Sequence, residues 1–364
     1  MSEFDEKQEH IHGLLAAHGL GALLLRRVSS FAWATCGAAS YVNSATTEGS
    51  ATLVVTRSGR YLITSNIEAT RLDQEEGLRA QGWEFSVAPW HETRDAVAEL
   101  TRGLRLGADM PGPEGLDLTG EIARLRVSLT PEEGERFAIL GGLCAQAMDS
   151  AIRQVRPGQT EHEIAACLAR EAERRGVQAI VNLIATDERV FKFRHPLATD
   201  RKLERYAMLV LCGRKGGLVC SITRLVHFGS LPDVLRRKAE AVAQVDATVI
   251  EATRPGRSLG EIFRMAVAAY ARVGFADEWK LHHQGGPAGY EPREMLARPD
   301  STELVAVGQA FAWNPSITGT KSEDTILVGE SGNTVLTHIS GWPLMKIPAE
   351  GGRKLARPAV LEIL

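Results

Sequence analysis

The sequence predicts an α+β protein in two parts, a smaller α/β domain over residues 1–127 and a larger domain over residues 128–364. Three observations lead to this prediction. The chain has 364 residues, which exceeds the usual size of a single domain. A strong helix-start motif begins just after Ser128, and a pattern within the larger part is repeated 98 residues further along the chain.

The N-terminal part alternates helix-like and strand-like stretches. Residues 57–59 are Arg-Ser-Gly, a short turn between two β-branched runs, which is typical of a hairpin. The elements expected in order are a helix over 6–18 that ends at Gly19, a strand over 21–28, the paired strands 51–56 and 60–65, and a helix over 95–104.

The larger part opens with a helix that its sequence defines at both ends. Thr130 is a good N-cap, Pro131 suits the first helical position, and Glu133 completes a capping box. The helix is expected to run to Arg156, where Pro157 and a glycine stop it.

An internal repeat follows. Arg-Pro-Gly at 156–158 returns at 254–256, and in both copies a Thr or Ser N-cap precedes a Glu at the third helical position. Each copy is a long helix, a stop and a second helix ending near a glycine.

Strand-like runs follow both copies. They cover 179–185, 206–212 and 217–228 after the first copy, and 309–317, 324–329 and 334–339 after the second. Two such units predict a domain with pseudo-two-fold symmetry, whose natural site is the cleft where the halves meet.

Composition excludes several classes of function. With 42 basic and 45 acidic residues the net charge is −3, and no cluster of Lys or Arg favours nucleic acid or a membrane surface as partner. The charged N-terminus does not resemble a signal peptide, and no apolar run is long enough to span a membrane. Five cysteines without a CxxC pair fit a reduced, cytoplasmic protein.

Several local sequences resemble the pita-bread domain of the creatinase, prolidase and aminopeptidase P family (peptidase M24). They occur in the family's order between about residues 128 and 364, and residues 1–127 resemble the family's smaller domain only loosely. The matching stretches are HPLATDRKLERYAMLVLCG (195–213), GLVCSITRLVHFG (217–229), HHQGGPAGYEP (282–292), FAWNPSI (311–317) and KSEDTILV (321–328).

The resemblance also shows which metal ligands are missing. The family binds two metal ions through two aspartates, one histidine and two glutamates. His283 and Glu323 match the histidine and the second glutamate, whereas Ser221 and Asn314 replace the second aspartate and the first glutamate. The first aspartate is replaced by Leu211 or Cys212, depending on the strand register.

This loss predicts that the chain binds no metal cofactor. Two divalent cations about 3.5–4 Å apart need several carboxylates to offset their charge, and three have gone. One metal ion on His283, Glu323 and Cys212 is the alternative, although a catalytic zinc site normally uses three firm protein ligands.

Creatinase-type members of the family imply a route without metal, in which a histidine is the acid/base. On this sequence that residue is His195, whose ordinary pKa lies near neutrality. The other catalytic residues expected are His283, to polarise a carbonyl, and Glu291 and Glu323, to accept substrate N–H groups or to orient water. The residues expected to bind substrate are Arg194, Arg224, Tyr290, Asn314 and Lys321.

Several of these residues have a structural alternative. His195 and His283 can be loop histidines, the glutamates can be salt-bridge partners, and Arg224 can belong to a buried ion pair. Tyr290 can belong to the core, like Trp33, Trp313 and the buried cysteines.

The sequence therefore predicts a metal-independent, creatinase-like hydrolase of a C–N bond in a small amino-acid-like or dipeptide-like substrate. The alternatives are an inactive pita-bread binding protein and an unorthodox Xaa-Pro metallo-aminopeptidase. The resemblance also implies a homodimer.

Overall fold

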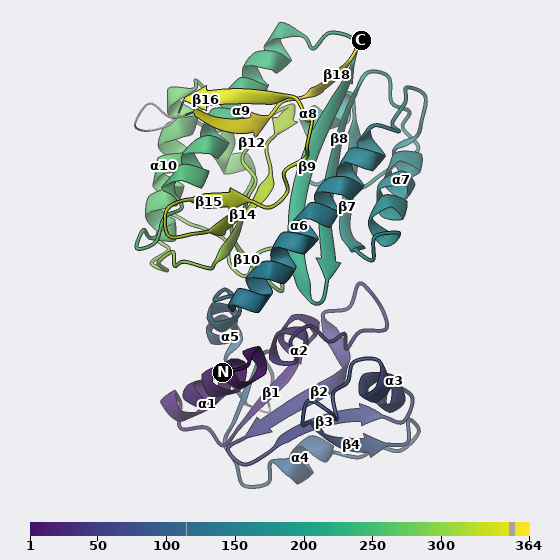
Figure 1. Ribbon diagram of the computed structural model, residues 1–364, viewed down its shortest axis with the longest axis vertical. Helices are drawn as coiled ribbons and strands as arrows, with labels where there is room; N and C mark the ends of the chain where they lie inside the picture. The colour runs from purple at the N-terminus through teal and green to yellow at the C-terminus, as the bar shows by residue number, and fades with distance from the viewer. Residues whose placement is uncertain (114, 349–353) are drawn as a thin grey trace. The chain divides into compact units, whose positions relative to one another are not determined.

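The computed structural model describes residues 1–113, 115–348 and 354–364 and shows two compact units (Figure 1). The smaller unit comprises Met1–Arg126 with Gly216–Leu218, and the larger comprises Val127–Lys215 with Val219–Leu364.

A six-stranded mixed sheet forms the smaller unit, in the order β4-β3-β2-β1-β5-β6. The predicted hairpin is present, since β2 and β3 pair antiparallel and Val54 faces Tyr61 across them. The elements of this unit are α1 (Glu3–Ala17), β1 (Ala22–Arg27), α2 (Val28–Ala34), β2 (Glu48–Thr56), β3 (Arg60–Ser65), α3 (Ala69–Gln74), β4 (Glu84–Ala88), α4 (Ala96–Leu100), β5 (Leu106–Ala108), β6 (Leu116–Asp117) and α5 (Thr119–Arg126).

The strand expected over 21–28 is present as β1, and helix α2 begins directly after it. Strand β1 ends at Arg27 because the carboxylate of Asp109 accepts the backbone N–H groups of Arg26 and Arg27, each at 2.9 Å. The apolar run that follows is buried in α2, where periodicity alone cannot separate a buried helix from a strand. The predicted helix over 95–104 is shorter, since α4 ends at Leu100.

The larger unit contains two four-stranded sheets, ordered β18-β9-β8-β7 and β10-β11-β14-β15, and the small pairs β12-β13 and β16-β17. In Figure 1, α6 and α7 lie beside the first sheet, and α9 and α10 lie beside the second. Its helices are α6 (Pro131–Ile152), α7 (Glu161–Glu173), α8 (Glu188–Lys192), α9 (Asp233–Ala252), α10 (Leu259–Arg272) and the 3₁₀ helix η1 (Glu278–Leu281). Its strands are β7 (Gln178–Thr186), β8 (Tyr206–Lys215), β9 (Leu218–Phe228), β10 (Gly285–Ala288), β11 (Ala310–Trp313), β12 (Ser316–Ile317), β13 (Thr320–Lys321), β14 (Asp324–Val328), β15 (Asn333–Val335), β16 (Leu344–Pro348), β17 (Lys354–Pro358) and β18 (Leu361–Ile363).

The internal repeat is visible as two pairs of helices, α6 with α7 and α9 with α10. Thr130, Thr160 and Ser258 each form a complete capping box with the glutamate three residues later. Gly158 and Gly256 both have positive φ, at 88° and 84°, so the two stops share a backbone turn that favours glycine. Helix α6 ends at Ile152, one turn before the predicted end at Arg156.

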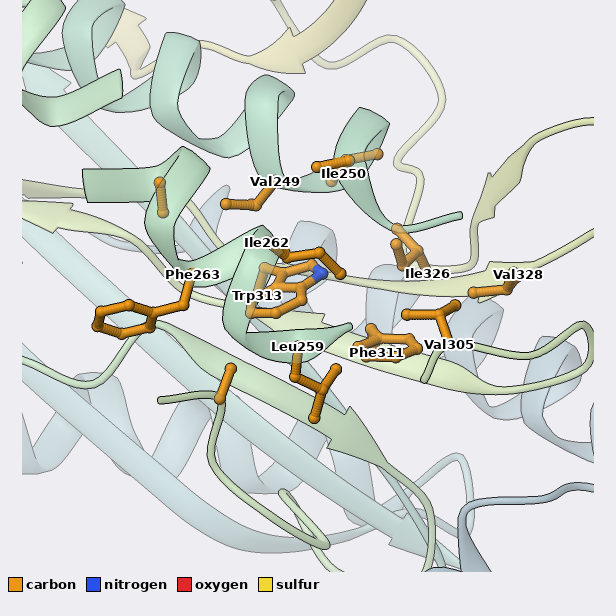
Figure 2. Packing of buried hydrophobic residues seen from close by; sticks show 13 residues of the cluster. Val249, Ile250, Leu259, Ile262, Phe263, Val305, Phe311, Trp313, Ile326 and Val328 are labelled. Atoms are coloured by element: carbon orange, nitrogen blue, oxygen red, sulfur yellow. The ribbon is translucent and has the colours of Figure 1, made fainter. Parts of the chain in front are cut away.

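The second half of the repeat encloses a hydrophobic core between α9, α10 and the strands β11 and β14 (Figure 2). Trp313 is fully buried there beside Phe311, and its indole N–H donates to Thr253 Oγ1 at 2.9 Å. Trp33 is also buried, in α2. Both tryptophans are therefore core residues.

Among the residues that the structure describes, no helix is both long and apolar enough to cross a membrane.

Candidate functional site

The two halves of the larger unit meet where β9 lies against the segment that leads into β14. Thr223 and Glu323 form an antiparallel bridge, with the Thr223 N–H donating to the Glu323 carbonyl at 3.2 Å. Ser221 and Thr325 add two hydrogen bonds beside it, at 3.0 and 2.9 Å. This junction fixes the positions of residues that the resemblance aligns with metal ligands.

Three histidines form a cluster in the same unit. His195 lies in the loop after α8, and His282 and His283 lie between η1 and β10. Their ring nitrogens lie within 4.8 Å of one another. Nε2 of His195 is 3.0 Å from Nε2 of His282, so in this pair one ring donates a hydrogen bond to the other. The rings of His282 and His283 stack with centroids 4.4 Å apart.

The surroundings keep these imidazoles neutral. Burial, together with nearby positive charges, lowers the pKa of His282 to about 2 and that of His283 to about 4. The pKa of His195 is also lowered, first by burial and then by the charge of Lys321, while the charge of Glu323 opposes the shift. At neutral pH all three rings are therefore unprotonated.

Glu323 is a buried carboxylate held by two cations. Its Oε1 accepts from Arg293 Nη2 at 2.9 Å, and its Oε2 accepts from Lys321 Nζ at 2.8 Å and from the Thr223 hydroxyl at 2.5 Å. Burial raises its pKa, but these cations outweigh burial and bring the pKa to about 2. Glu323 is thus ionised at neutral pH, and both of its oxygens are engaged.

Ser221 and Cys212 lie next to this carboxylate. Cys212 Sγ is 3.3 Å from Ser221 Oγ, and Arg293 Nη1 donates to the same oxygen at 3.0 Å. The strand register therefore brings Cys212, rather than Leu211, to the position beside Ser221. Burial raises the pKa of Cys212 to about 11, so the side chain is a neutral thiol at neutral pH.

Asn314 follows β11, and its side chain is 3% exposed. Its backbone N–H donates to the carbonyl of Gln284 at 3.0 Å, which ties it to the loop that carries the histidines. Within the described chain, its side-chain oxygen Oδ1 has no hydrogen-bond partner.

Three other predicted residues engage groups outside the cluster. Arg224 is buried and bonds Asp324 at 2.8 Å. The hydroxyl of Tyr290 donates to Glu133. Arg194 donates to Glu278 at 2.7 Å and to Thr318 at 3.1 Å. For Arg224 this contact is the buried ion pair that was the structural alternative, and Tyr290 is buried as a core residue would be.

Glu291 lies in the loop after β10 and is half-buried. Its backbone N–H donates to Glu294 Oε1 at 3.1 Å, and Glu294 also accepts the N–H of Tyr290 at 2.8 Å. This loop carries Arg293 two residues further on.

Sequence reasoning missed two members of the site, His282 and Arg293. His282 contacts His195 across 87 positions of the chain, and Arg293 reaches Glu323 across 30. In the sequence, His282 is marked only by its position next to His283, and Arg293 only by its position after Glu291-Pro292. Neither feature indicates which distant residue the side chain contacts.

The donor set does not fit a pair of metal ions. Both oxygens of Glu323 are bonded to protein donors, so a metal ion would have to displace Lys321, Arg293 or the Thr223 hydroxyl from this carboxylate. Lys321 and Arg293 also place two positive charges beside Glu323, which the resemblance aligns with a metal ligand. Two metal ions bound at this position would be repelled by the charges of Lys321 and Arg293.

The family model described as metallopeptidase family M24 matches residues 135–330, which is more than half of the chain. Over 308 residues the chain is 28% identical to "Agropine synthesis cyclase" of Rhizobium rhizogenes, covering 70% of this chain and 75% of the relative. Over 228 residues it is 28% identical to "Xaa-Pro dipeptidase" of Pyrococcus furiosus, covering 59% of this chain and 64% of the relative.

The crystal structure of the prolidase from Pyrococcus horikoshii OT3 superposes with a TM-score of 0.80 at 19% identity, covering 92% of this chain and 99% of that one. This similarity shows the fold. The chain therefore has the α+β pita-bread architecture that the sequence predicts.

Proposed function

Because the chain belongs to metallopeptidase family M24, we propose that it is a hydrolase of that family which cleaves a C–N bond in a small amino-acid-like substrate without a metal ion. The family assignment is the basis for expecting an enzyme of C–N bond hydrolysis. The finer part, independence from metal, is an inference from the donor set described above.

One observation carries the proposal: the neutral pair His195–His282 lies in one cluster with His283 and near the cations that hold Glu323. A neutral imidazole pair can take a proton from water and return it to a leaving nitrogen. Glu323, which the resemblance aligns with a metal ligand, is bonded to a lysine and an arginine, and this supports a site without metal ions.

Each residue of the cluster has a separate role in the proposed reaction. The His195–His282 pair accepts a proton from a solvent water as its oxygen attacks the substrate carbon. The same pair then delivers that proton to the nitrogen as the C–N bond breaks. His283, stacked on His282, is available to donate a hydrogen bond to the substrate, and the Asn314 Oδ1 is available to accept one from a substrate N–H.

The names of two relatives describe different reactions, which supports testing more than one class of substrate. One is named an Xaa-Pro dipeptidase and another an agropine synthesis cyclase, a name that describes ring closure rather than peptide hydrolysis. Dipeptides and small cyclic or guanidino acids are accordingly the first substrates to test.

The test is an assay for release of amine or ammonia from a panel of Xaa-Pro dipeptides, guanidino acids and cyclic amides, with and without EDTA. We expect turnover that EDTA does not change and that His195→Ala lowers by at least about 100-fold. His162→Ala, an exposed histidine on α7, is the matched control and should keep full activity. Loss of activity in EDTA, restored by one metal, would contradict the proposal.

A second candidate is a mononuclear metallopeptidase, which the three-histidine cluster favours, because three ring nitrogens within 4.8 Å are a possible ligand set for one ion. Elemental mass spectrometry after dialysis against zinc, manganese or cobalt separates the two candidates. A stable stoichiometry of one ion per chain, lost in His282→Asn, would establish the second.

A further inference from the structure

Lys321, Glu323 and Arg293 form a buried triad with a net positive charge. The side chains are 5%, 3% and 9% exposed, respectively. The neighbouring hydroxyls and the Cys212 thiol are uncharged, and the pKa values of the three histidines are lowered. Two fixed cations against one carboxylate leave about one unit of positive charge in a setting of low polarity, where a charge acts strongly.

The triad retains hydrogen-bonding capacity beyond its internal ion pairs. Within the described residues, Arg293 Nε is buried without a hydrogen-bond partner. The ammonium of Lys321 has three N–H groups, of which Glu323 accepts one at 2.8 Å. An isolated N–H donor that is buried is costly, so its presence beside the histidines indicates a group that a negatively charged ligand would satisfy.

We propose that Arg293 and Lys321 are catalytic residues that bind the negative charge which develops on the substrate, and that they thereby take the role for which other members of the family use metal ions. This inference rests on the proposed function and adds to it the groups that stabilise the transition state. Glu323 is a positioning residue in this scheme, because its carboxylate lies between two like charges and holds each at a fixed distance.

For an amide substrate, the reaction consists of attack by water followed by loss of the amine. A water oxygen forms a bond to the carbonyl carbon, its proton goes to the His195–His282 pair, and the π electrons of the C=O bond move to its oxygen. Arg293 and Lys321 stabilise that oxyanion. The electrons then return to re-form C=O, the C–N bond breaks, and the nitrogen takes the proton from the histidine pair. The products are a carboxylic acid and an amine.

The competing explanation is that the triad only stabilises the fold, since buried ion pairs can be structural. The two explanations differ in what the triad does to an anion added from outside. A structural triad binds no small anion, whereas a catalytic pair of cations binds a tetrahedral oxyanion.

The first measurement is calorimetric titration of the whole chain with inorganic phosphate, a tetrahedral anion, at pH 8. We expect binding that Arg293→Gln weakens at least tenfold and that Arg293→Lys weakens less, because it keeps the charge. Arg298→Gln, an exposed arginine in the same loop region, is the control and should leave binding unchanged. Absence of phosphate binding to the wild-type protein would overturn the inference.

The second measurement is kcat and KM on whichever probe substrate is turned over. We expect Arg293→Gln and Lys321→Gln each to lower kcat about 100-fold with KM nearly constant. Arg293→Gln leaves the buried carboxylate of Glu323 with one partner fewer, which can destabilise the fold. The double variant Arg293→Gln/Glu323→Gln removes this carboxylate as well and so serves as a second test. Circular dichroism checks the fold of each variant.

The two proposals can fail separately. Phosphate binding that depends on Arg293, without turnover of any substrate, would retain the anion site and reject the hydrolase. Turnover that persists within twofold in folded Arg293→Gln and Lys321→Gln would retain the hydrolase and reject this inference.

Discussion

His195 is the side chain whose ionisation should govern the rate of the proposed reaction. Its pKa lies below its ordinary value because of burial and the charge of Lys321, and Glu323 opposes this shift. The neutral ring is the base, so activity should decline only as the pH falls below about 6.5, the ordinary histidine pKa. A pH profile of kcat/KM measures the position of this acid limb.

Two substitutions near His195 should move that limb in opposite directions. Lys321→Met removes a positive charge and should shift the limb to higher pH, whereas Glu323→Gln removes a negative charge and should shift it to lower pH. The position of the limb is independent of the height of the profile, so a general loss of activity does not hide the result. Equal shifts in both variants, or none, would mean that His195 does not titrate in the reaction.

The histidine cluster should also make stability depend on pH. The pKa values of His282 and His283 are about 2 and about 4 in the folded chain, against an ordinary value near 6.5 in the unfolded chain. Between pH 6.5 and 5 the unfolded chain binds protons that the folded chain does not. The free energy of unfolding should therefore fall as the pH is lowered, by about 1.4 kcal/mol per pH unit for each proton of difference.

Urea unfolding at several pH values between 6.5 and 5 measures this slope. His282→Asn should reduce the slope relative to wild type, because one proton-binding difference is removed. His162→Asn, at an exposed position, should leave it unchanged. A slope that is the same in His282→Asn and wild type would show that His282 is protonated in the folded chain.

At the scale of elements, the duplicated helix starts offer an internal comparison. The hydroxyls of Thr160 and Ser258 accept the N–H groups of Glu163 and Glu261, each at 3.2 Å, and the two glutamates return a bond to the cap. Replacement of either cap by alanine should lower the free energy of unfolding by about 1 kcal/mol.

Because α7 and α10 are equivalent in the repeat, we expect the two losses to be of similar size and additive in Thr160→Ala/Ser258→Ala, since the sites share no partners. Thr248→Ala within α9 is the control, expected to change stability by less than about 0.5 kcal/mol. Chemical denaturation of the wild type and the four variants gives the values. A loss confined to one cap would mean that the helices are not equivalent in stability.

At the scale of the whole molecule, a buried network ties the C-terminal segment to the rest of the larger unit. Arg357 on β17 bonds Asp246 of α9 at 2.5 Å and Asp324 of β14 at 2.6 Å, and Arg224 of β9 bonds Asp324 as well. These four side chains are at most 3% exposed. They connect four elements that are distant in sequence.

Arg357→Met should lower the free energy of unfolding by about 3–5 kcal/mol, because it leaves two carboxylates buried with too few partners. The comparison is Arg236→Met, which removes a partly exposed pair with Glu362 at 3.0 Å and should cost less than about 1 kcal/mol. Thermal and chemical unfolding measure both. Similar losses in the two variants would mean that the buried network adds no more stability than a surface pair.

Two predictions at this scale remain predictions from sequence, namely the homodimer and the cytoplasmic location. Both follow from the resemblance or from cysteine usage rather than from contacts within the chain.

Features that depend on short stretches of chain were predictable from the sequence. Thr130, Thr160 and Ser258 cap helices as predicted, and the glycines after Arg156-Pro157 and Arg254-Pro255 adopt the same positive-φ turn just after each first helix. These features were predictable because capping bonds and positive φ angles involve residues a few positions apart. The family motifs likewise predicted the fold, since their order along the chain is a linear property.

The set of side chains that meet in the site became apparent from the three-dimensional arrangement of the elements. The pairing of His195 with His282, and the approach of Arg293 to Glu323, depend on loops that sequence leaves unconstrained. The position of Cys212 beside Ser221 depends on strand register, where a shift of one residue turns a side chain to the other face of the sheet. The physical reason is the same in each case: long-range contacts are set by the packing of whole elements, which no local pattern encodes.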